Sequence, residues 1–148
     1  MDSVLKIVKM MNRSKLGIIK SILHLYLRVV YACDIMPDTN IGDGTRFPHR
    51  GLGVVINNNA IIGKNCIISK GVVIGGRNGN KIVPSIGDNV LIGANAVVLG
   101  AIKVGKDVSI GALCVVTHDI PDGATVVGNP AKIIKIYGDP IDKDTNLK

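Results

Sequence analysis

The stretch that decides the fold runs from residue 86 to residue 121 and reads IGDNVL IGANAV VLGAIK VGKDVS IGALCV VTHDIP. An aliphatic residue returns at every sixth position of this stretch, and an apolar residue follows it four places later. Six is not a multiple of the 3.6-residue repeat of a helix, whereas short strands joined by sharp turns bring one residue of every hexad to the same inward corner. The repeat therefore predicts an all-β solenoid. Its aliphatic series consists of Ile86, Ile92, Val98, Val104, Ile110 and Val116.

The same period begins at Ile35 but is interrupted twice before Ile86. Nine residues separate Phe47 from Ile56, where the pattern requires six. A second interruption, residues 75–85, is rich in glycine and contains a proline, which predicts a loop that projects from the solenoid. A break in a stacked array disturbs its alignment, so we expect both interruptions to serve function.

The N-terminal segment follows a different period. Apolar residues recur at steps of three and four across residues 4–31, which predicts an amphipathic helix. We expect residues 1–33 to form a helical cap over the open first coil, because terminal repeats need their edges covered. The alternative is a basic helix that contacts an anionic membrane. The solenoid is expected to cover residues 34–135, and residues 136–148 to form a flexible tail.

Composition narrows the possible functions. The 148 residues are 47% apolar but only 3% aromatic, and the formal net charge is +7. With so few aromatic rings for base stacking and no groove-reading motif, we expect no nucleic-acid partner. The three cysteines are far apart, and we interpret Cys66 and Cys114, which fall on inward repeat positions, as core residues. We expect a cytoplasmic protein without a signal peptide or spanning helix. Flat aliphatic faces on a triangular solenoid favour a homotrimer.

Four further motifs accompany the hexads. They are an Asp-Ile-Met-Pro opening at residue 34, Val-Val-Ile at 54–56, a glycine pair at 75–76, and Val-Gly-Asn-Pro-Ala-Lys at 127–132. Together with the hexads, they resemble the hexapeptide-repeat acyltransferases, and more narrowly the serine acetyltransferase branch with its polysaccharide O-acetyltransferase relatives. The resemblance implies a left-handed parallel β-helix and transfer of an acetyl group from acetyl-CoA.

The resemblance also implies a catalytic pair, Asp34 and His49, whose fifteen-residue spacing matches the catalytic Asp and His of the family. An imidazole suits the role of general base because its pKa lies near working pH. Asp34 would bond one ring nitrogen and stabilise the imidazolium that forms. The alternative is that His49 is a solvated corner residue. No histidine cluster suggests a metal site, and no metal is expected.

For acetyl-CoA, the resemblance implies a groove between neighbouring subunits along the later coils. Gly75 and Gly76 match the family's glycine pair, where the absence of Cβ lets a ligand approach the backbone. Ala94 and Ala112 would leave room for the pantetheine arm, and Lys132 would meet the nucleotide phosphates.

The chain departs from serine acetyltransferases at the positions that hold the amino acid. Pro48 stands where they have an acidic residue, and Ile82 and Val83 replace an Arg-His pair. A neutral sugar hydroxyl needs no such charges, so a sugar or a surface-polysaccharide precursor is the favoured acceptor. Serine remains an alternative, with Arg50 or Arg77 as the cation that holds its carboxylate. A β-helix without catalytic activity, acting as a scaffold, is a third hypothesis.

Overall fold

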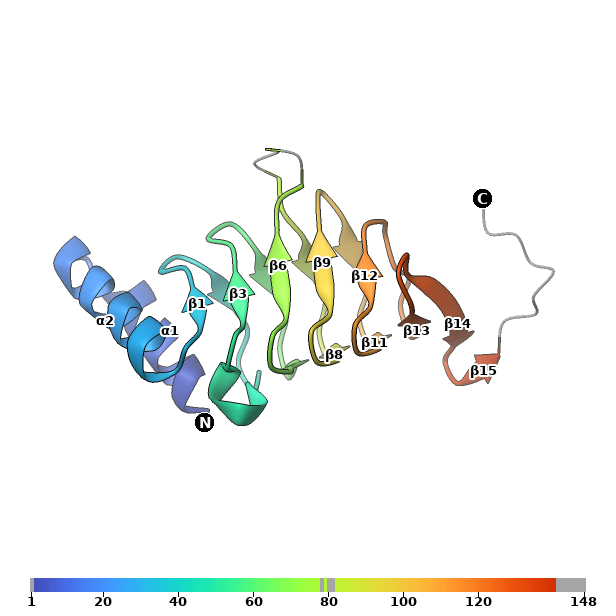
Figure 1. Cartoon of the computed structure of the whole chain (residues 1–148), viewed down its shortest axis with the longest axis horizontal. Coiled ribbons are helices and arrows are strands. Elements are labelled where there is room, and N and C mark those ends of the chain that lie inside the picture. Colours follow the sequence, from blue (N-terminus) through green and yellow to red (C-terminus); the bar gives the residue numbers. More distant parts are fainter. Residues whose placement is uncertain (1, 78, 80–81, 141–148) are drawn as a thin grey trace.

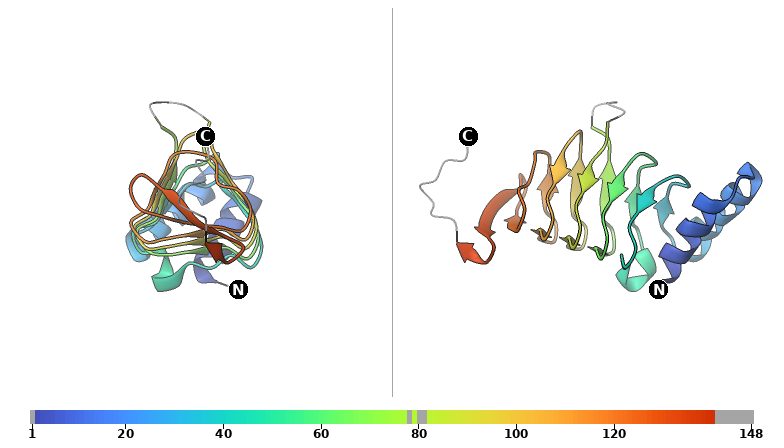
Figure 2. Two further views of the ribbon diagram at one scale, coloured as in Figure 1. Left: turned by 90° about the vertical axis from the view of Figure 1, so that its right-hand side faces the viewer. Right: turned by 180° about the vertical axis from the view of Figure 1, so that it is seen from behind.

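The computed structural model describes residues 2–77, 79 and 82–140, and it shows a three-sided solenoid with two helices at its N-terminal end (Figures 1 and 2). Each coil contributes a short strand to each side, so strands stack in parallel on their equivalents in neighbouring coils. The first side consists of β1 (Asp34–Ile35), β3 (Val55–Ile56), β6 (Val73–Gly75), β9 (Val97–Leu99) and β12 (Val115–Val116).

The second side follows the same rule, and the third side follows it as far as β13. The second side consists of β2 (Asn40–Ile41), β4 (Ile61–Ile62), β7 (Ser85–Ile86) and β10 (Lys103–Val104). The third side consists of β5 (Ile67–Ile68), β8 (Leu91–Ile92), β11 (Ser109–Ile110), β13 (Ala124–Val127), β14 (Lys132–Ile136) and β15 (Asp139–Pro140). The predicted solenoid is therefore confirmed.

Aliphatic residues of the hexads fill the interior. Ile92, Val98 and Ile110 are completely buried, as the six-residue period predicts. All three cysteines are free thiols inside this core. Dispersion contacts between stacked Ile and Val side chains and the removal of their surface from water hold successive coils together.

Strand pairing explains both interruptions of the period. Val98 pairs with Val116, eighteen residues on, which is the regular length of one coil. Ile35 pairs with Ile56, so the first coil holds three extra residues. Ile74 pairs with Val98, so that coil holds six extra residues, and they project as the loop above β6 (Figure 1). The predicted loop over 75–85 is thus confirmed in outline, although its residues 78, 80 and 81 lie outside the described residues.

Two helices replace the single amphipathic helix expected over residues 4–31. They are α1 (Ser3–Arg13) and α2 (Gly17–Val30). The chain turns at Ser14, which adopts an extended conformation while its N–H donates to the carbonyls of Met10 and Met11. The three- and four-residue steps continue across this turn, so the apolar pattern did not reveal it.

Helix α1 covers the open end of the first coil. Its apolar face is completely buried, and its N-cap residue Asp2 accepts a bond from the backbone N–H of Phe47 at 3.0 Å. Lys9 forms an ion pair with Asp43. The buried residues of α1 are Val4, Leu5, Val8 and Met11. Within the described residues, no helix is long and apolar enough to cross a membrane.

The solenoid ends in antiparallel pairing. Strand β14 folds back on β13, and β15 then pairs with β14. Regular structure therefore continues to residue 140, past the boundary at 135 that the sequence predicted. The remainder of the predicted tail, residues 141–148, lies outside the described residues.

Candidate functional site

The corner that leads into β3, where the first coil is three residues longer than a regular coil, contains a four-residue 3-10 turn, η1 (Pro48–Gly51). His49 and Arg50 both adopt left-handed backbone conformations, with φ of 56° and 57°. Such a conformation costs about 1–2 kcal/mol for a residue with a Cβ. Both side chains are exposed. The turn therefore presents two side chains to solvent from a strained backbone. Strained backbone of this kind is concentrated at functional sites.

Asp34 does not contact His49 in this structure. Its Oδ1 instead lies 2.7 Å from Nε2 of His24, on helix α2, and its Oδ2 lies 4.0 Å from Nε of Arg28. No hydrogen bond or ion pair of the His49 side chain occurs among the described residues. Asp34 is thus paired with His24 in this arrangement, and the pairing of Asp34 with His49 stays a prediction. Sequence spacing placed both at one end of the coil, but it could not reveal that α2 brings another imidazole to Asp34.

Two of the predicted elements do come together. A groove of about 210 Å³ on the first side of the solenoid contains Asp34 at one end and the glycine pair at the other. It crosses four stacked strands, with Leu99 of β9 beside the glycines. The residues between these ends are Met36, Val55, Ile56, Asn57, Val73 and Ile74. The sequence-predicted catalytic carboxylate and acetyl-CoA glycines therefore share one mostly apolar groove.

A second cavity of about 230 Å³ lies on the other side of Asp34, between α2 and the first coil. Arg28 and Cys33 line it with Asp34. Burial, and to a lesser extent the negative charge of Asp34, raise the pKa of the Cys33 thiol to about 11. The thiol is therefore protonated at neutral pH and is a poor nucleophile. A neutral thiol, a carboxylate and a guanidinium therefore lie together around this cavity.

The remaining predicted residues lie outside the groove. Ala94 and Ala112 occupy equivalent corners of adjacent coils, and the carbonyl of Ala94 accepts the N–H of the residue after Ala112 at 2.9 Å. Lys132 is exposed at the start of β14. The stem of Arg77 packs over Gly100, whose N–H donates to the carbonyl of Gly75 at 3.0 Å. Arg77 therefore lies close to the glycine pair, whereas Arg50 lies on η1.

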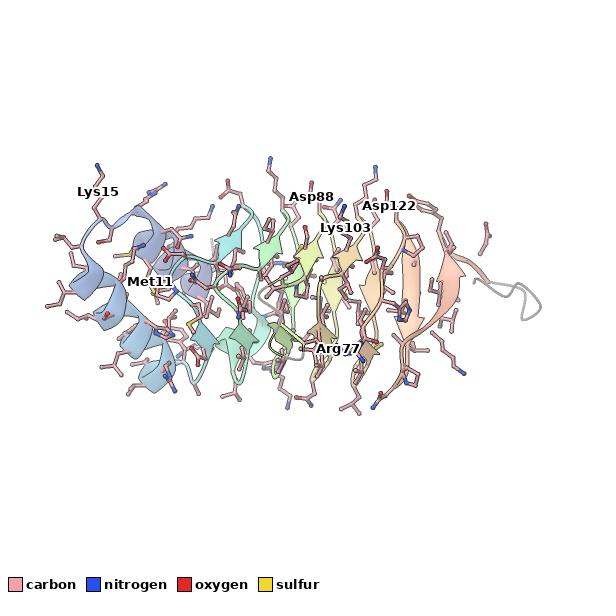
Figure 3. All side chains as sticks on the ribbon, turned by 90° about the horizontal axis from the view of Figure 1, so that it is seen from above. Met11, Lys15, Arg77, Asp88, Lys103 and Asp122 are labelled. Carbon is pink, nitrogen blue, oxygen red and sulfur yellow. The ribbon has the colours of Figure 1, made fainter. Side chains whose placement is uncertain are left out.

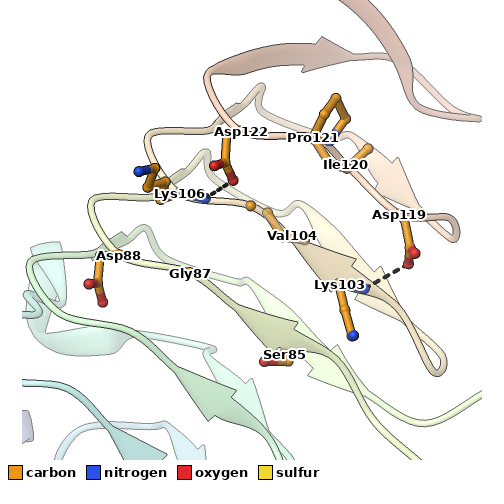
Figure 4. A pocket seen from close by; sticks show the side chains of 11 residues that line it. Ser85, Gly87, Asp88, Lys103, Val104, Lys106, Asp119, Ile120, Pro121 and Asp122 are labelled. Carbon is orange, nitrogen blue, oxygen red and sulfur yellow. Dashed lines mark hydrogen bonds between the residues drawn. The ribbon is translucent and has the colours of Figure 1, made fainter.

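A third hollow, of about 710 Å³, lies on the second side of the solenoid and was not predicted (Figure 4). Asp119 and Asp122 line it, and each carboxylate accepts a backbone N–H of the preceding coil, from Lys103 at 2.8 Å and Lys106 at 2.9 Å. These carboxylates therefore hold coils together. Figure 3 shows Lys103 and Asp122 along one edge of the solenoid. In the part of the chain that the structure describes, no group of three His, Cys, Asp or Glu residues could hold a metal.

Known proteins resemble this chain in both repeat and sequence. The family model of the bacterial transferase hexapeptide (six repeats) matches residues 84–118. A serine acetyltransferase of Synechococcus elongatus is 37% identical over 142 residues, which are 93% of this chain and 58% of that protein. A serine acetyltransferase of Helicobacter pylori is 45% identical over 109 residues, which are 72% of this chain and 63% of that protein.

Solved structures agree with these relatives. Serine acetyltransferase of Neisseria gonorrhoeae in complex with serine superposes with a TM-score of 0.81 at 35% identity, covering 89% of this chain and 55% of that one. The soybean enzyme complexed with serine gives 0.77 at 40% identity, covering 86% and 53%. The chain thus spans between half and two thirds of the length of these relatives. It belongs to the hexapeptide-repeat proteins, and its left-handed β-helix is homologous to that of the serine acetyltransferases.

Proposed function

We propose that this chain is an acetyl-CoA-dependent O-acetyltransferase whose acceptor is the hydroxyl of serine. The observation that carries the proposal is the groove that joins Asp34 to Gly75 and Gly76 in a chain homologous to serine acetyltransferases. A scaffold has no need of a groove with a carboxylate at one end and a glycine pair at the other. The homology also favours serine over the sugar acceptor that the sequence alone favoured.

The structure offers charges for serine that the motif positions lack. Arg28 lies 4.0 Å from Asp34 and is more than half exposed, so its guanidinium can bind a carboxylate at the mouth of the second cavity. This cation comes from helix α2. The departures at Ile82 and Val83 therefore do not exclude an amino-acid acceptor.

In the proposed reaction His49 is the general base. It removes the proton of the acceptor hydroxyl as the oxygen attacks the thioester carbonyl carbon, and the resulting imidazolium returns the proton to the departing thiolate of CoA. A carbon–oxygen bond forms, the carbon–sulfur bond breaks, and O-acetylserine and free CoA result. Asp34 can orient His49 only after it exchanges its present bond to His24 for one to His49.

Acetyl-CoA is proposed to lie along the later coils. The thioester end of acetyl-CoA would lie against Gly75 and Gly76, where no Cβ blocks the groove. Ala94 and Ala112 would flank the pantetheine arm, and exposed Lys132 would meet the phosphates. This arrangement is proposed to be completed by a neighbouring subunit of a homotrimer, which the mass of the protein in solution would test.

Release of free thiol from acetyl-CoA tests the proposal. The expected result is a higher kcat/KM with L-serine than with any sugar or nucleotide sugar, and no release with O-methylserine, whose hydroxyl is blocked. Fast release with a sugar but not with serine would contradict the proposed acceptor. Absence of release with every acceptor would instead favour a scaffold.

A further inference from the structure

Helix α2 turns its aliphatic side outward. Ile18, Ile22, Leu25 and Val29 form one stripe along the helix, and their side chains are 71, 60, 61 and 73% exposed. A helix on the surface of a soluble domain ordinarily places such a stripe against the core. Further exposed apolar residues extend the stripe at its edges and ends: Leu16, Ile19, Tyr26 and Val30. We call these eight residues the α2 outer face.

Two polar residues of α2, Lys20 and His24, point the opposite way. Lys20 forms an ion pair with Asp38, and His24 bonds Asp34 at 2.7 Å, so both side chains lie against the first coil. Leu27 is the buried apolar anchor beside them. The helix is thus held to the solenoid partly by polar contacts, and its apolar stripe contributes little to that attachment. Exposed apolar area of this extent marks a site of interaction.

Positive charge gathers at the same end of the molecule. The first thirty residues carry six basic side chains and one acidic one, so they hold +5 of the net charge of +7. Arg13, Lys15 and Arg28 are exposed, and Lys15 projects from the turn between the helices (Figure 3). An exposed cation, Lys15 or Arg28, therefore lies near each end of α2.

We propose that the α2 outer face docks on an anionic phospholipid surface. An apolar stripe flanked by basic residues lies in the interface between lipid headgroups and acyl chains, and each basic side chain adds attraction to anionic lipids. A second copy of this chain is the less suitable occupant, because it would bring a second surface with the same positive charge into contact.

The position of α2 at one end of the molecule is compatible with docking on a bilayer. Both helices lie at one end of the solenoid, and the coils extend away from them (Figures 1 and 2). A bilayer beneath α2 would leave the groove on the first side of the solenoid open to solvent. The variants that test the proposal change Lys15 and Leu25, which the proposed acetyl transfer does not use, so lipid binding and acetyl transfer can fail separately.

Vesicle co-sedimentation tests the proposal on the full chain. The probes are vesicles of phosphatidylcholine alone and vesicles of phosphatidylcholine with phosphatidylglycerol. We expect binding only to the mixed vesicles, and weaker binding at high salt, because screening shortens the range of the attraction. Absence of binding to the mixed vesicles, or equal binding to both kinds, would overturn the proposal.

Matched variants separate the stripe from general charge effects. Leu25→Glu should abolish binding, whereas Leu113→Glu, which makes the same change at a 69% exposed leucine on the solenoid, should leave it intact. Lys15→Glu should weaken binding by roughly tenfold, and Lys70→Glu by much less, because attraction falls off beyond the Debye length. Equal effects within either pair would contradict the proposal. So would a Leu25→Glu variant that alters only the mass of the protein in solution, since the face would then join copies of the chain.

Discussion

The first coil and the later coils are built from the same hexads but turn their corners differently. Later corners place one residue in the left-handed region, and at one corner it is Asn65, Asn89 and Asp107 in successive coils. Asn and Asp tolerate this conformation, and their side chains join neighbouring coils, with Asn89 donating to Asp107 at 2.9 Å. At the corner that leads into β3, the first coil instead places His49 and Arg50 in the left-handed region in succession.

The corners of the first coil and those of the later coils thus have different roles. In the later coils the side chains of Asn89 and Asp107 join neighbouring coils, and the strands repeat at eighteen residues from Ile92 to Ile110. In the first coil the corner residues contribute no hydrogen bonds of their side chains among the described residues and remain exposed. We infer that the later coils provide the frame and the first coil provides chemistry. The following predictions test that division, from the largest effect on stability to the smallest.

The largest effect is expected in the regular frame. Ile92→Ala removes a completely buried side chain between stacked coils and should lower the free energy of unfolding by about 3 kcal/mol. The rate of acetyl transfer per folded molecule should not change. Urea unfolding and thiol release measure the two quantities, and a loss of activity at full folding would contradict the division.

Cys33, beside Asp34, should make stability depend on pH. Its folded pKa of about 11 lies above the ordinary value of 9.0, so the folded state holds the proton more tightly. The contribution to stability is complete below pH 9 and is lost as pH rises towards 11, by about 2 kcal/mol. The free energy of unfolding, measured from pH 8 to pH 11, should therefore decline less steeply in Cys33→Ala than in the unchanged protein.

Cys114 in the regular coils is the matched control. Burial also raises the pKa of its thiol, but no carboxylate adds to the shift. Cys114→Ala should therefore flatten the pH dependence less than Cys33→Ala does. An equal or larger change in Cys114→Ala would show that the first coil has no special electrostatic character.

The smallest effect concerns the strained corner. Arg50→Gly should stabilise the chain by about 0.5–1 kcal/mol, because glycine adopts the left-handed conformation without strain. The gain is smaller than the strain itself, since glycine loses more conformational entropy on folding. Asn65→Gly should give no gain, because Asn already tolerates its φ of 56°. Thermal unfolding of both variants measures the difference. A gain at Asn65 with none at Arg50 would contradict the assignment of strain to the first coil.

The regular coils could be predicted well because every hexad repeats the same pattern of inward aliphatic residues. Ile92, Val98 and Ile110 are each buried for one reason, so the period alone places them inside. The two interruptions were also visible as breaks in that period. The break between the helices was not visible, because the apolar steps continue across Ser14.

The site was harder to predict because it depends on how separate elements approach one another. The groove between Asp34 and the glycine pair follows from stacking, which the register predicts. The bond from His24 to Asp34 arises because helix α2 packs on β1, and no spacing rule links a helix to a strand in that way. No sequence motif marked the hollow beside Asp119 and Asp122 either. Their carboxylates accept backbone N–H groups of the preceding coil, and backbone donors leave no mark in the sequence.

The most direct test of the central claim compares the two histidines that compete for the role of base. Thiol release from acetyl-CoA with L-serine should be measured for His49→Gln and His24→Gln, with both variants shown to be folded. We expect a loss of about 10²–10⁴-fold in kcat for His49→Gln and a much smaller change for His24→Gln. Full activity in His49→Gln together with loss in His24→Gln would contradict this expectation and assign the reaction to the His24–Asp34 pair.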